Sequence, residues 1–426
     1  MRTLRSRHRL TVTLLGLLAA AACARPTPPA APTPAPPPAP APERAPAPAP
    51  DTLERAQKAR ADSAARERER AVARARADSA DTTGVRVCAG GDVTLGTNLD
   101  TTWAPLAARK LGRRVVALPD PDSLLAPLRP LVRDADVVLV NVEGAIGSGP
   151  TIRKCAPGSS SCFAFRMPVA AAAALRRLNR DAVVVANVAN NHARDAGDDG
   201  WRTTARHLRA AGVAVTGVDT LATPVVTARG DTIAFLGFST NAGPDLRDLD
   251  AVRRHVARAA AQYGRVVVTM HQGAEGSGAQ RTRDTTEIFL DIDRGNPVAF
   301  AGAAVGAGAN LLVGHGPHVL RAAEWRGGSL VFYSLGNLLT YGPFTLRDPN
   351  DRGAVACAVV NRVGRVARAE LRPTRQQPAG GVAPDAERRA LTLVDSLGAL
   401  DFPSTGARVD AGGSLLRHTE SAAVTP

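Results

Sequence analysis

The feature that most constrains the fold is an alternation of short β-branched runs with amphipathic stretches from residue 85 to about residue 320. Such alternation is typical of βαβ units, in which helices cover the faces of a sheet. We predict strands at 85–89, 136–140, 181–186, 231–238, 265–270 and 310–314, and helices at 122–133, 168–179, 200–211 and 248–262. Three later runs without helices between them predict a meander at 322–325, 329–334 and 353–360, and a last helix is predicted at 385–398.

The segment before residue 84 has the composition of a targeting signal followed by a tether, that is, a linker to the folded domain. Arginines precede an apolar run at 10–22 that ends in alanines and Cys23. This order is typical of an export signal. The small residues before Cys23 are similar to a bacterial lipoprotein signal, which implies lipidation of Cys23 and anchoring in the cell envelope. The alternative is ordinary signal-peptidase cleavage and a soluble secreted product.

The tether has two parts. Residues 25–50 hold 13 of the 32 prolines and predict an extended, stiff spacer. Residues 51–80 are rich in Ala, Arg, Glu and Asp, and they predict a solvated single helix or a disordered charged segment. The predicted organisation is a signal peptide at 1–23, a linker at 24–83, an α/β domain at 84–375, and a C-terminal helix and tail at 376–426.

The net charge of +14 invites a nucleic-acid interpretation, which we reject. Only three of the 53 basic residues are lysines, and no Lys/Arg-rich block marks a phosphate-binding stripe. Of the cysteines, Cys155 and Cys162 lie in one loop and predict a disulfide, with a metal pair as the alternative. Cys88 and Cys357 lie in apolar runs and are predicted to be buried thiols, because a disulfide there depends on their separation.

Candidate ligands follow the predicted strands, where ligands gather in open α/β sheets. Taken singly, each residue could have a purely structural role, such as a helix cap, a left-handed turn or an interior histidine. Together, oxygen and imidazole groups predict Zn, Mn, Fe, Ni or Co rather than Ca or Mg. The candidates are Asp92, Asn141, Glu143, Asn191, His192, Asp195, His271, His315 and His318.

Six motifs in order resemble the CapA family of capsule (poly-γ-glutamate) synthesis proteins, which belongs to the calcineurin-like metallophosphoesterases. They are GGDVTLG (90–96), NVEGAI (141–146), ANNHARDAG (189–197), HQGAE (271–275), GHGPHVL (314–320) and YSLGN (333–337). The resemblance implies a four-layer α/β-β-α sandwich.

The resemblance also implies roles for individual residues. One or two ions of Mn, Zn, Fe or Ni would be held by Asp92, Glu143, Asn191, His271, His315 and His318. His192 would be the acid facing the substrate, and Asp195 is a candidate to orient it. Substrate contacts are assigned to Asn141, Glu275, Arg283 and Asn337; Asn337, with Ser334, is also a candidate for loop support.

Three departures from the family pattern bear on the chemistry. Thr94 stands where the phosphoesterases have a histidine, which favours a weak second metal site or a mononuclear centre. The motif HQGAEG lacks the usual Trp and Tyr, which removes aromatic side chains from the site. An additional segment at 281–297 carries Arg281, Arg283 and Arg294, which either bind an anion or are solvated.

The expected function is therefore hydrolysis of a phosphate ester by metal-activated water in an exported protein of capsule synthesis. The main alternative is a non-hydrolytic accessory protein that binds an anionic envelope polymer such as polyglutamate. A weaker alternative is a surface-bound scaffold whose main functional part is the tether. The expected partners are a phosphate ester or such a polymer, and a membrane reached through the lipid anchor.

Overall fold

The computed structural model describes residues 58, 60–63, 65–66, 83–95, 103–148, 154 and 162–418. The chain divides into two compact units, Met1–Ala64 and Ala65–Pro426. In the first, residues 58 and 60–63 are helical and exposed, whereas the predicted signal, Cys23 and the proline-rich spacer lie outside the described residues. Within the described part of the chain, no helix is long and apolar enough to cross a membrane.

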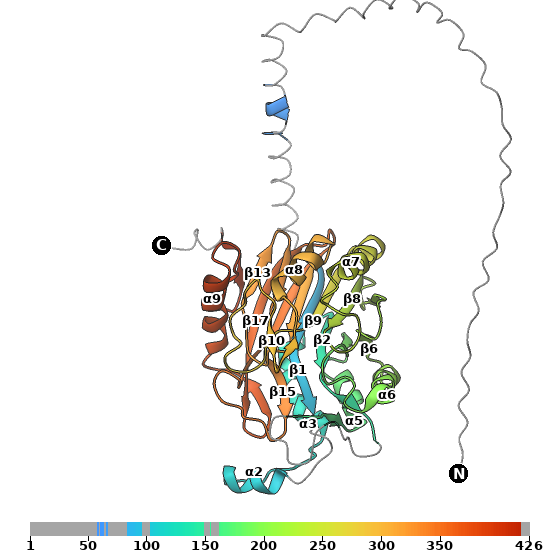
Figure 1. The fold of residues 1–426 in the computed structure, drawn as a ribbon, viewed down its shortest axis with the longest axis vertical. Coiled ribbons are helices and arrows are strands. Elements are labelled where there is room, and N and C mark those ends of the chain that lie inside the picture. The colour runs from blue at the N-terminus through green and yellow to red at the C-terminus, as the bar shows by residue number, and fades with distance from the viewer. Residues whose placement is uncertain are drawn as a thin grey trace, which may run out of the picture. The chain divides into compact units, whose positions relative to one another are not determined.

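The second unit is a mixed α/β structure, as the alternation predicted, and it is built on two large sheets (Figure 1). The first sheet has the order β18-β17-β16-β1-β2-β5-β6, with β15 paired to the far end of β1. Its strands are β1 (Gly84–Leu95), β2 (Val137–Val142), β5 (Val183–Asn187), β6 (Ala214–Thr216), β15 (Asn337–Tyr341), β16 (Arg352–Asn361), β17 (Val366–Gln377) and β18 (Gly381–Pro384).

The second sheet has the order β13-β14-β12-β9-β8-β7. Its strands are β7 (Thr223–Val226), β8 (Thr232–Ser239), β9 (Val266–His271), β12 (Leu311–His315), β13 (Ala323–Arg326) and β14 (Ser329–Phe332). Short strand pairs add β3 (Ala145–Ile146) with β4 (Arg166–Met167), β10 (Ile288–Phe289) with β11 (Ile292–Asp293), and β19 (Arg408–Val409) with β20 (Leu415–Leu416).

Three buried apolar clusters define the layers. The middle cluster contains Val87 of β1, Phe235 of β8 and Val313 of β12, so the two sheets pack face to face. A second cluster joins the outer face of the first sheet to α3 (Pro121–Leu125), η1 (Ala126–Leu128), α4 (Arg129–Val132), α5 (Ala170–Arg176) and α6 (Gly197–Ala210). A third joins the second sheet to α7 (Leu249–Tyr263) and α8 (Pro297–Gly306). Alternate residues of β1 enter different clusters, as strand geometry requires.

The six predicted strands are confirmed as β1, β2, β5, β8, β9 and β12, with boundary shifts mostly of one or two residues. The helix predicted at 122–133 is instead divided into α3, η1 and α4, because Pro127 and Pro130 lack the N–H groups that a continuous helix needs. Two helices were missed: α2 (Trp103–Leu111) and α8. Helix α8 lacks amphipathic spacing, but Asn296 caps it and Pro297 occupies its first turn.

The C-terminal part differs from the predicted meander and domain boundary. Strands β13 and β14 form a hairpin in the second sheet, whereas β16 belongs to the first sheet. The chain therefore crosses from one sheet to the other, and the three predicted strands do not form one meander. Strand β17 continues past the expected boundary at residue 375. Helix α9 (Arg389–Asp401) buries Ala390, Leu391 and Val394 in the middle cluster, so it completes the core of the same body.

Cys88 and Cys357 form a disulfide, which corrects the prediction of two buried thiols. They lie 269 residues apart in sequence but are direct partners in the antiparallel register of β1 and β16. The sequence does not reveal that register, which is set by the sheet. Cys162 is also disulfide-bonded. Cys155, its predicted partner, lies outside the described residues.

Candidate metal centre

The predicted ligands meet because register places them in two rows at the carboxyl ends of the strands. In the first sheet Asn337, Asp92, Asn141 and Asn187 are successive partners on β15, β1, β2 and β5. In the second sheet His315, His271 and Ser239 are partners on β12, β9 and β8. These strands run parallel within each sheet, so their polar ends lie at one edge.

Asp92 connects the two rows and is fully buried. Its Oδ1 lies 3.8 Å from His271 Nδ1 and 3.7 Å from His315 Nδ1, and its Oδ2 lies 3.1 Å from His318 Nδ1. Close approach of β1 to the loop before β15 requires Gly91, because a Cβ there would lie 1.9 Å from the carbonyl oxygen of Gly336. Three imidazoles therefore surround one carboxylate.

Glu143 completes the centre from the loop after β2. Its Oε1 lies 3.8 Å from His271 Nε2 and 3.6 Å from His318 Nε2, distances too long for hydrogen bonds. One ligand atom each from Asp92, Glu143 and His318 lies within 4.8 Å of the others. A shared cation fits this spacing and this donor set.

Unpartnered buried atoms test whether the residues suit a metal. Buried polar atoms in proteins normally have a hydrogen-bond partner. Among the described residues, several atoms of the predicted ligands have none: Glu143 Oε1 and Oε2, His271 Nε2, His315 Nδ1 and Nε2, and Asn191 Oδ1. One nitrogen of a neutral His315 carries a proton, but its other nitrogen and the remaining atoms are lone-pair atoms of ligating groups, given suitable imidazole tautomers, so the residues fit a divalent transition metal.

Burial and neighbouring charges shift the pKa values of the residues in the centre. Burial raises the pKa of Glu143 well above its usual value, and the negative charges of Asp92 and Glu275 add to the effect. Burial would also raise the pKa of Asp92, but the hydrogen bond and charge of His318 hold that pKa below its usual value. Burial lowers the pKa of His271, and it lowers that of His315 to about 4. Neutral His271 and His315 suit a metal, whereas at His318 the charge of Glu143 and the hydrogen bond of Asp92 outweigh burial and raise the pKa well above its usual value, so a binding cation would displace protons from His318 and Glu143.

His318 is held in an unusual backbone conformation. Its φ of 58° lies in the left-handed region, which for a residue other than glycine costs on the order of 1 kcal/mol or more. Its Nδ1 lies 2.9 Å from Asn337 Oδ1, and Asn337 Nδ2 donates back to the His318 carbonyl at 3.4 Å. Asn337 is itself buried, so its contacts fit the loop-support role better than the predicted substrate contact.

Glu275 lies at the open side of the centre. Its Oε2 is 3.7 Å from His318 Nε2, and its Oε1 accepts a hydrogen bond from Asn191 Nδ2 at 3.3 Å. Arg294 forms an ion pair with the same carboxylate, with Nη2 3.0 Å from Oε1. Of the arginines in the additional segment, Arg294 is therefore the one brought to the centre. Arg283 is exposed and makes none of these contacts.

Arg281, the remaining arginine of the additional segment, pairs with Asp401 and not with a residue of the centre. A second buried pair, which sequence reasoning missed, ties the segment to the centre. Arg321 follows the His318 loop and binds both carboxylate oxygens of Glu287 at 2.7 Å. Glu287 also accepts a hydrogen bond from the Ala274 amide at 2.7 Å. The segment 281–297 is thus bonded to the two loops that carry His318 and Glu275.

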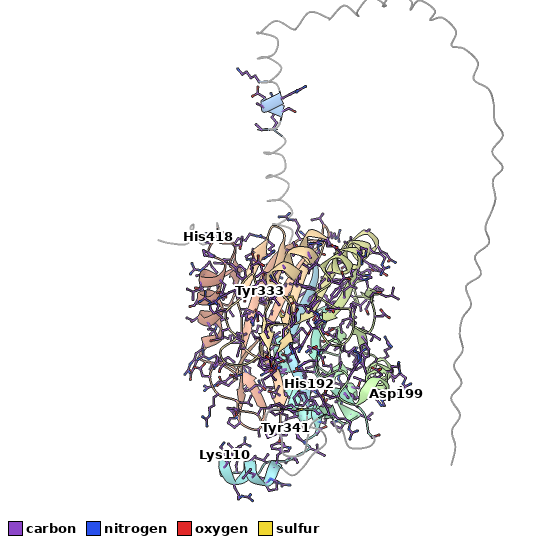
Figure 2. The ribbon with its side chains drawn as sticks, viewed as in Figure 1. Lys110, His192, Asp199, Tyr333, Tyr341 and His418 are labelled. Carbon is purple, nitrogen blue, oxygen red and sulfur yellow. A yellow bond between two sulfur atoms is a disulfide. The ribbon has the colours of Figure 1, made fainter. Side chains whose placement is uncertain are left out.

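His192 lies beside the metal ligands with its orientation fixed. Its Nδ1 is 2.6 Å from Asp195 Oδ2, which also accepts from the Phe165 amide at 2.7 Å. Lys154 binds the other oxygen of Asp195, a contact that sequence reasoning missed. Figure 2 shows His192 toward the same end of the view as Tyr341, the last residue of β15. Burial lowers the pKa of His192, and Asp195 opposes that shift.

Asparagines behind the ligands hold them in place. Asn141, a predicted substrate contact, is fully buried and donates to Asp92 Oδ1 at 2.7 Å, so it orients the aspartate. Asn187 and Asn190 each donate to Asn141 Oδ1. Asn187 was missed, although its place at the end of a predicted strand was a usable signal. Thr94 donates to the Glu143 carbonyl at 3.2 Å.

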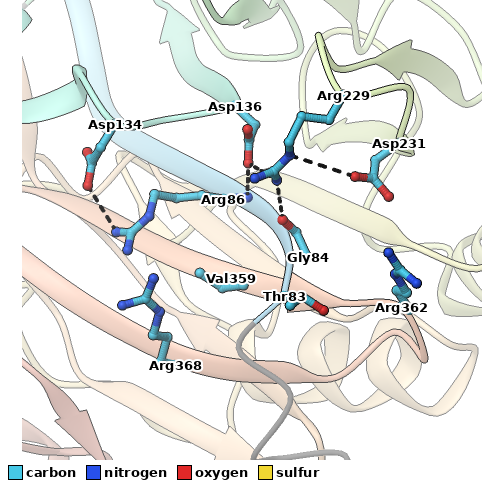
Figure 3. A pocket seen from close by; sticks show the side chains of 10 residues that line it. All are labelled: Thr83, Gly84, Arg86, Asp134, Asp136, Arg229, Asp231, Val359, Arg362 and Arg368. Carbon is cyan, nitrogen blue, oxygen red and sulfur yellow. Dashed lines mark hydrogen bonds and ion pairs between the residues drawn. The ribbon is translucent and has the colours of Figure 1, made fainter.

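A separate cavity of about 450 Å³ lies at the opposite, amino-terminal end of β1 (Figure 3). Its acids are paired with arginines: Arg86 with Asp134, and Arg229 with Asp136 and Asp231. None of the predicted site residues lines it. The chemistry-bearing residues therefore converge at the other end of the strands.

Comparisons with known proteins identify the family of this chain. The family described as "Bacterial capsule synthesis protein PGA_cap" matches residues 86–341. "PGA biosynthesis protein CapA" of Bacillus subtilis is 26% identical over 235 residues, which cover 51% of this chain and 57% of that protein. GAP50, "the anchor in the inner membrane complex of Plasmodium", is similar over 73% of this chain and 95% of its own at 8% identity, but its TM-score of 0.31 is too low to establish a shared fold. From the match over 86–341, the chain belongs to the bacterial capsule synthesis protein family PGA_cap.

Proposed function

We propose that this member of the capsule synthesis family is a metal-dependent hydrolase of the metallophosphoesterase type, acting on a phosphate ester. The observation that carries the proposal is the cluster of Asp92, Glu143, His271, His315 and His318, in which Glu143, His271 and His315 keep buried ligand atoms without hydrogen-bond partners. A purely structural cluster would be expected to satisfy these atoms internally, because an unmade buried hydrogen bond is costly.

The centre would hold its metal with Asp92, Glu143 and His318 at the core, and with His271, His315 and Asn191 around them. A bound Mn, Zn, Fe or Ni ion would supply a Lewis acid for a phosphate oxygen and lower the pKa of a water molecule. Thr94 offers only a neutral hydroxyl, a weak ligand for these metals, where the related phosphoesterases have a histidine, and this hydroxyl donates to the Glu143 carbonyl. This favours one strong site over two equal ones.

His192 is placed to deliver a proton to the leaving oxygen. Its Nδ1 is committed to Asp195, which leaves Nε2 for the substrate. With Nδ1–H donated to Asp195, Nε2 carries a proton only in the charged imidazolium; burial lowers the pKa of His192, and Asp195 opposes that shift by stabilising the charged ring. As water attacks phosphorus and the bond to the leaving alcohol breaks, that proton passes from Nε2 to the alcohol oxygen. Asp195 is a positioning residue in this scheme.

The test combines metal analysis with esterase assays on the purified protein. We expect bound metal and cleavage of a chromogenic phosphate monoester or diester, with loss of cleavage but not of metal in His192→Ala. Asp195→Asn should lower kcat by about a hundredfold or more with little change in metal content. Asp198→Asn is the matched control, because Asp198 is exposed and pairs only with Arg194 among the described residues.

Two outcomes would reject the proposal. Protein loaded with Mn, Zn, Fe or Ni that cleaves none of several esters would exclude hydrolysis as the function. Full activity in His192→Ala would exclude the assigned proton donor. Polyglutamate binding without cleavage would instead point to the accessory role.

We further propose that the chain is exported and held at the cell envelope through lipidation of Cys23. The support is the order of basic, apolar and small residues before that cysteine. Lipid labelling and membrane fractionation of wild type and Cys23→Ala test this directly. Unchanged membrane association in the variant would remove the anchor from the account.

A further inference from the structure

Three phenylalanines adjoin the proposed proton donor, although the sequence pattern indicated a loss of aromatic residues near the site. The Phe165 ring lies 4.1 Å from the His192 ring, centroid to centroid, at an interplanar angle of 31°. Phe344 meets Phe165 edge-on at 5.6 Å. Phe163 lies 5.7 Å from Phe344 and 6.2 Å from Phe165. We call Phe163, Phe165 and Phe344 the aromatic wall.

The wall is separate from the hydrophobic core. Its three members belong to none of the three buried apolar clusters found among the described residues. Phe165 is buried, but Phe163 is 42% exposed and is the one aromatic among the exposed large apolar side chains of the described part. The chain has only nine phenylalanines. A third of them gather beside one histidine, and the row of rings runs from that histidine to solvent.

We propose that the aromatic wall binds the leaving group of the substrate, and that this group is apolar. The inference rests on the proposed function, because it takes His192 as the donor to the leaving oxygen. A leaving oxygen at His192 Nε2 places the rest of the leaving group beside the rings that adjoin the imidazole; Phe165 is buried against His192, and the half-buried Phe344 and the exposed Phe163 offer the accessible faces. Aromatic faces favour apolar and planar groups over solvated ones.

Binding of non-hydrolysable phosphonates tests the inference without relying on turnover. Isothermal calorimetry on Mn²⁺-loaded protein would compare methylphosphonate, n-hexylphosphonate and phenylphosphonate. We expect the phenyl compound to bind about tenfold more tightly than the methyl compound. Tighter binding of both larger compounds identifies a general apolar site, whereas tighter binding of the phenyl compound alone identifies an aromatic leaving group.

Variants of the wall localise the effect. Phe163→Ala should reduce the preference for the phenyl compound to about threefold or less while leaving methylphosphonate affinity unchanged. Phe344→Leu provides a second, milder variant, and melting temperatures show whether either one is misfolded. Leu221→Ala is the control, because Leu221 is 61% exposed and lies in the loop between β6 and β7.

The two proposals fail in different ways. Equal affinity for all three phosphonates in the wild type, or equal weakening of all three in Phe163→Ala, overturns the aromatic-wall inference alone. Absence of binding by every phosphonate to metal-loaded protein overturns the phosphoesterase site, and the leaving-group inference falls with it.

Discussion

Glu143→Gln separates the metal-binding role of this residue from any role in the metal-free fold. Glu143 is fully buried beside Asp92 and near Glu275, and neither of its carboxylate oxygens has a hydrogen-bond partner among the described residues. The substitution keeps the shape of the side chain and removes a group whose ionisation burial opposes. We therefore expect the metal-free variant to be as stable as the wild type or more stable, whereas most changes in a buried site destabilise.

The metal-loaded forms should differ in the opposite direction. At a free Mn²⁺ concentration of 100 times Kd, binding stabilises the wild type by about 2.7 kcal/mol, which for a body of this size raises Tm by about 4 °C. If loss of the Glu143 carboxylate weakens binding about a hundredfold, the same concentration stabilises the variant by only about 0.4 kcal/mol. The variant's Tm should then rise by less than about 1 °C.

Differential scanning calorimetry with and without Mn²⁺ measures both effects. Glu387→Gln is the matched control, because Glu387 is exposed and lies on the α9 side of the chain, and it should behave as the wild type. The reasoning is refuted if Glu143→Gln keeps the full Mn²⁺-dependent rise, or if the metal-free variant melts well below the wild type.

Three further predictions concern the folded body. Cys357→Ala removes a disulfide that closes a long loop, so urea unfolding should show a loss of about 2–4 kcal/mol; an unchanged midpoint would contradict this. Glu287→Gln leaves the buried Arg321 without its carboxylate, so we expect a loss of about 3–5 kcal/mol by the same assay, and a loss below 1 kcal/mol would be inconsistent with it. Hydrogen bonds from Arg372 lower the pKa of Asp134 to about 2 from 3.8, so its stabilising effect is complete above pH 3.8 and disappears as the pH falls through 2; urea midpoints of Asp134→Asn and wild type should differ at pH 7 and converge near pH 2, and a constant difference would count against the assignment.

Sequence periodicity predicted that the candidate ligands come together, because they follow parallel strands. Asp92, His271 and His315 end or nearly end strands whose apolar runs are long and β-branched, and parallel strands bring such ends to one edge. The sequence could not separate ligands from their supports. Asn141 and Glu143 are two residues apart, yet one is committed to Asp92 and the other has unpartnered oxygens.

Contacts that depend on tertiary pairing could not be predicted from the sequence. The Cys88–Cys357 bond depends on antiparallel register between β1 and β16, and the Arg321–Glu287 pair depends on how the segment 281–297 folds back. No local pattern encodes either arrangement. The aromatic wall was missed for the same reason, since Phe344 reaches Phe165 from a segment far along the chain.

The double attachment of segment 281–297 limits how this protein can be shortened. Deleting the segment would remove the partner of Arg321 and also Arg294, the cation beside Glu275. It would therefore leave one enclosed cation and one uncompensated carboxylate on the loops that hold the centre. A stable shortened protein would need substitutions of Arg321 and Glu275 as well as the deletion. We therefore expect proteins related to this one to gain or lose the segment together with changes at those two positions.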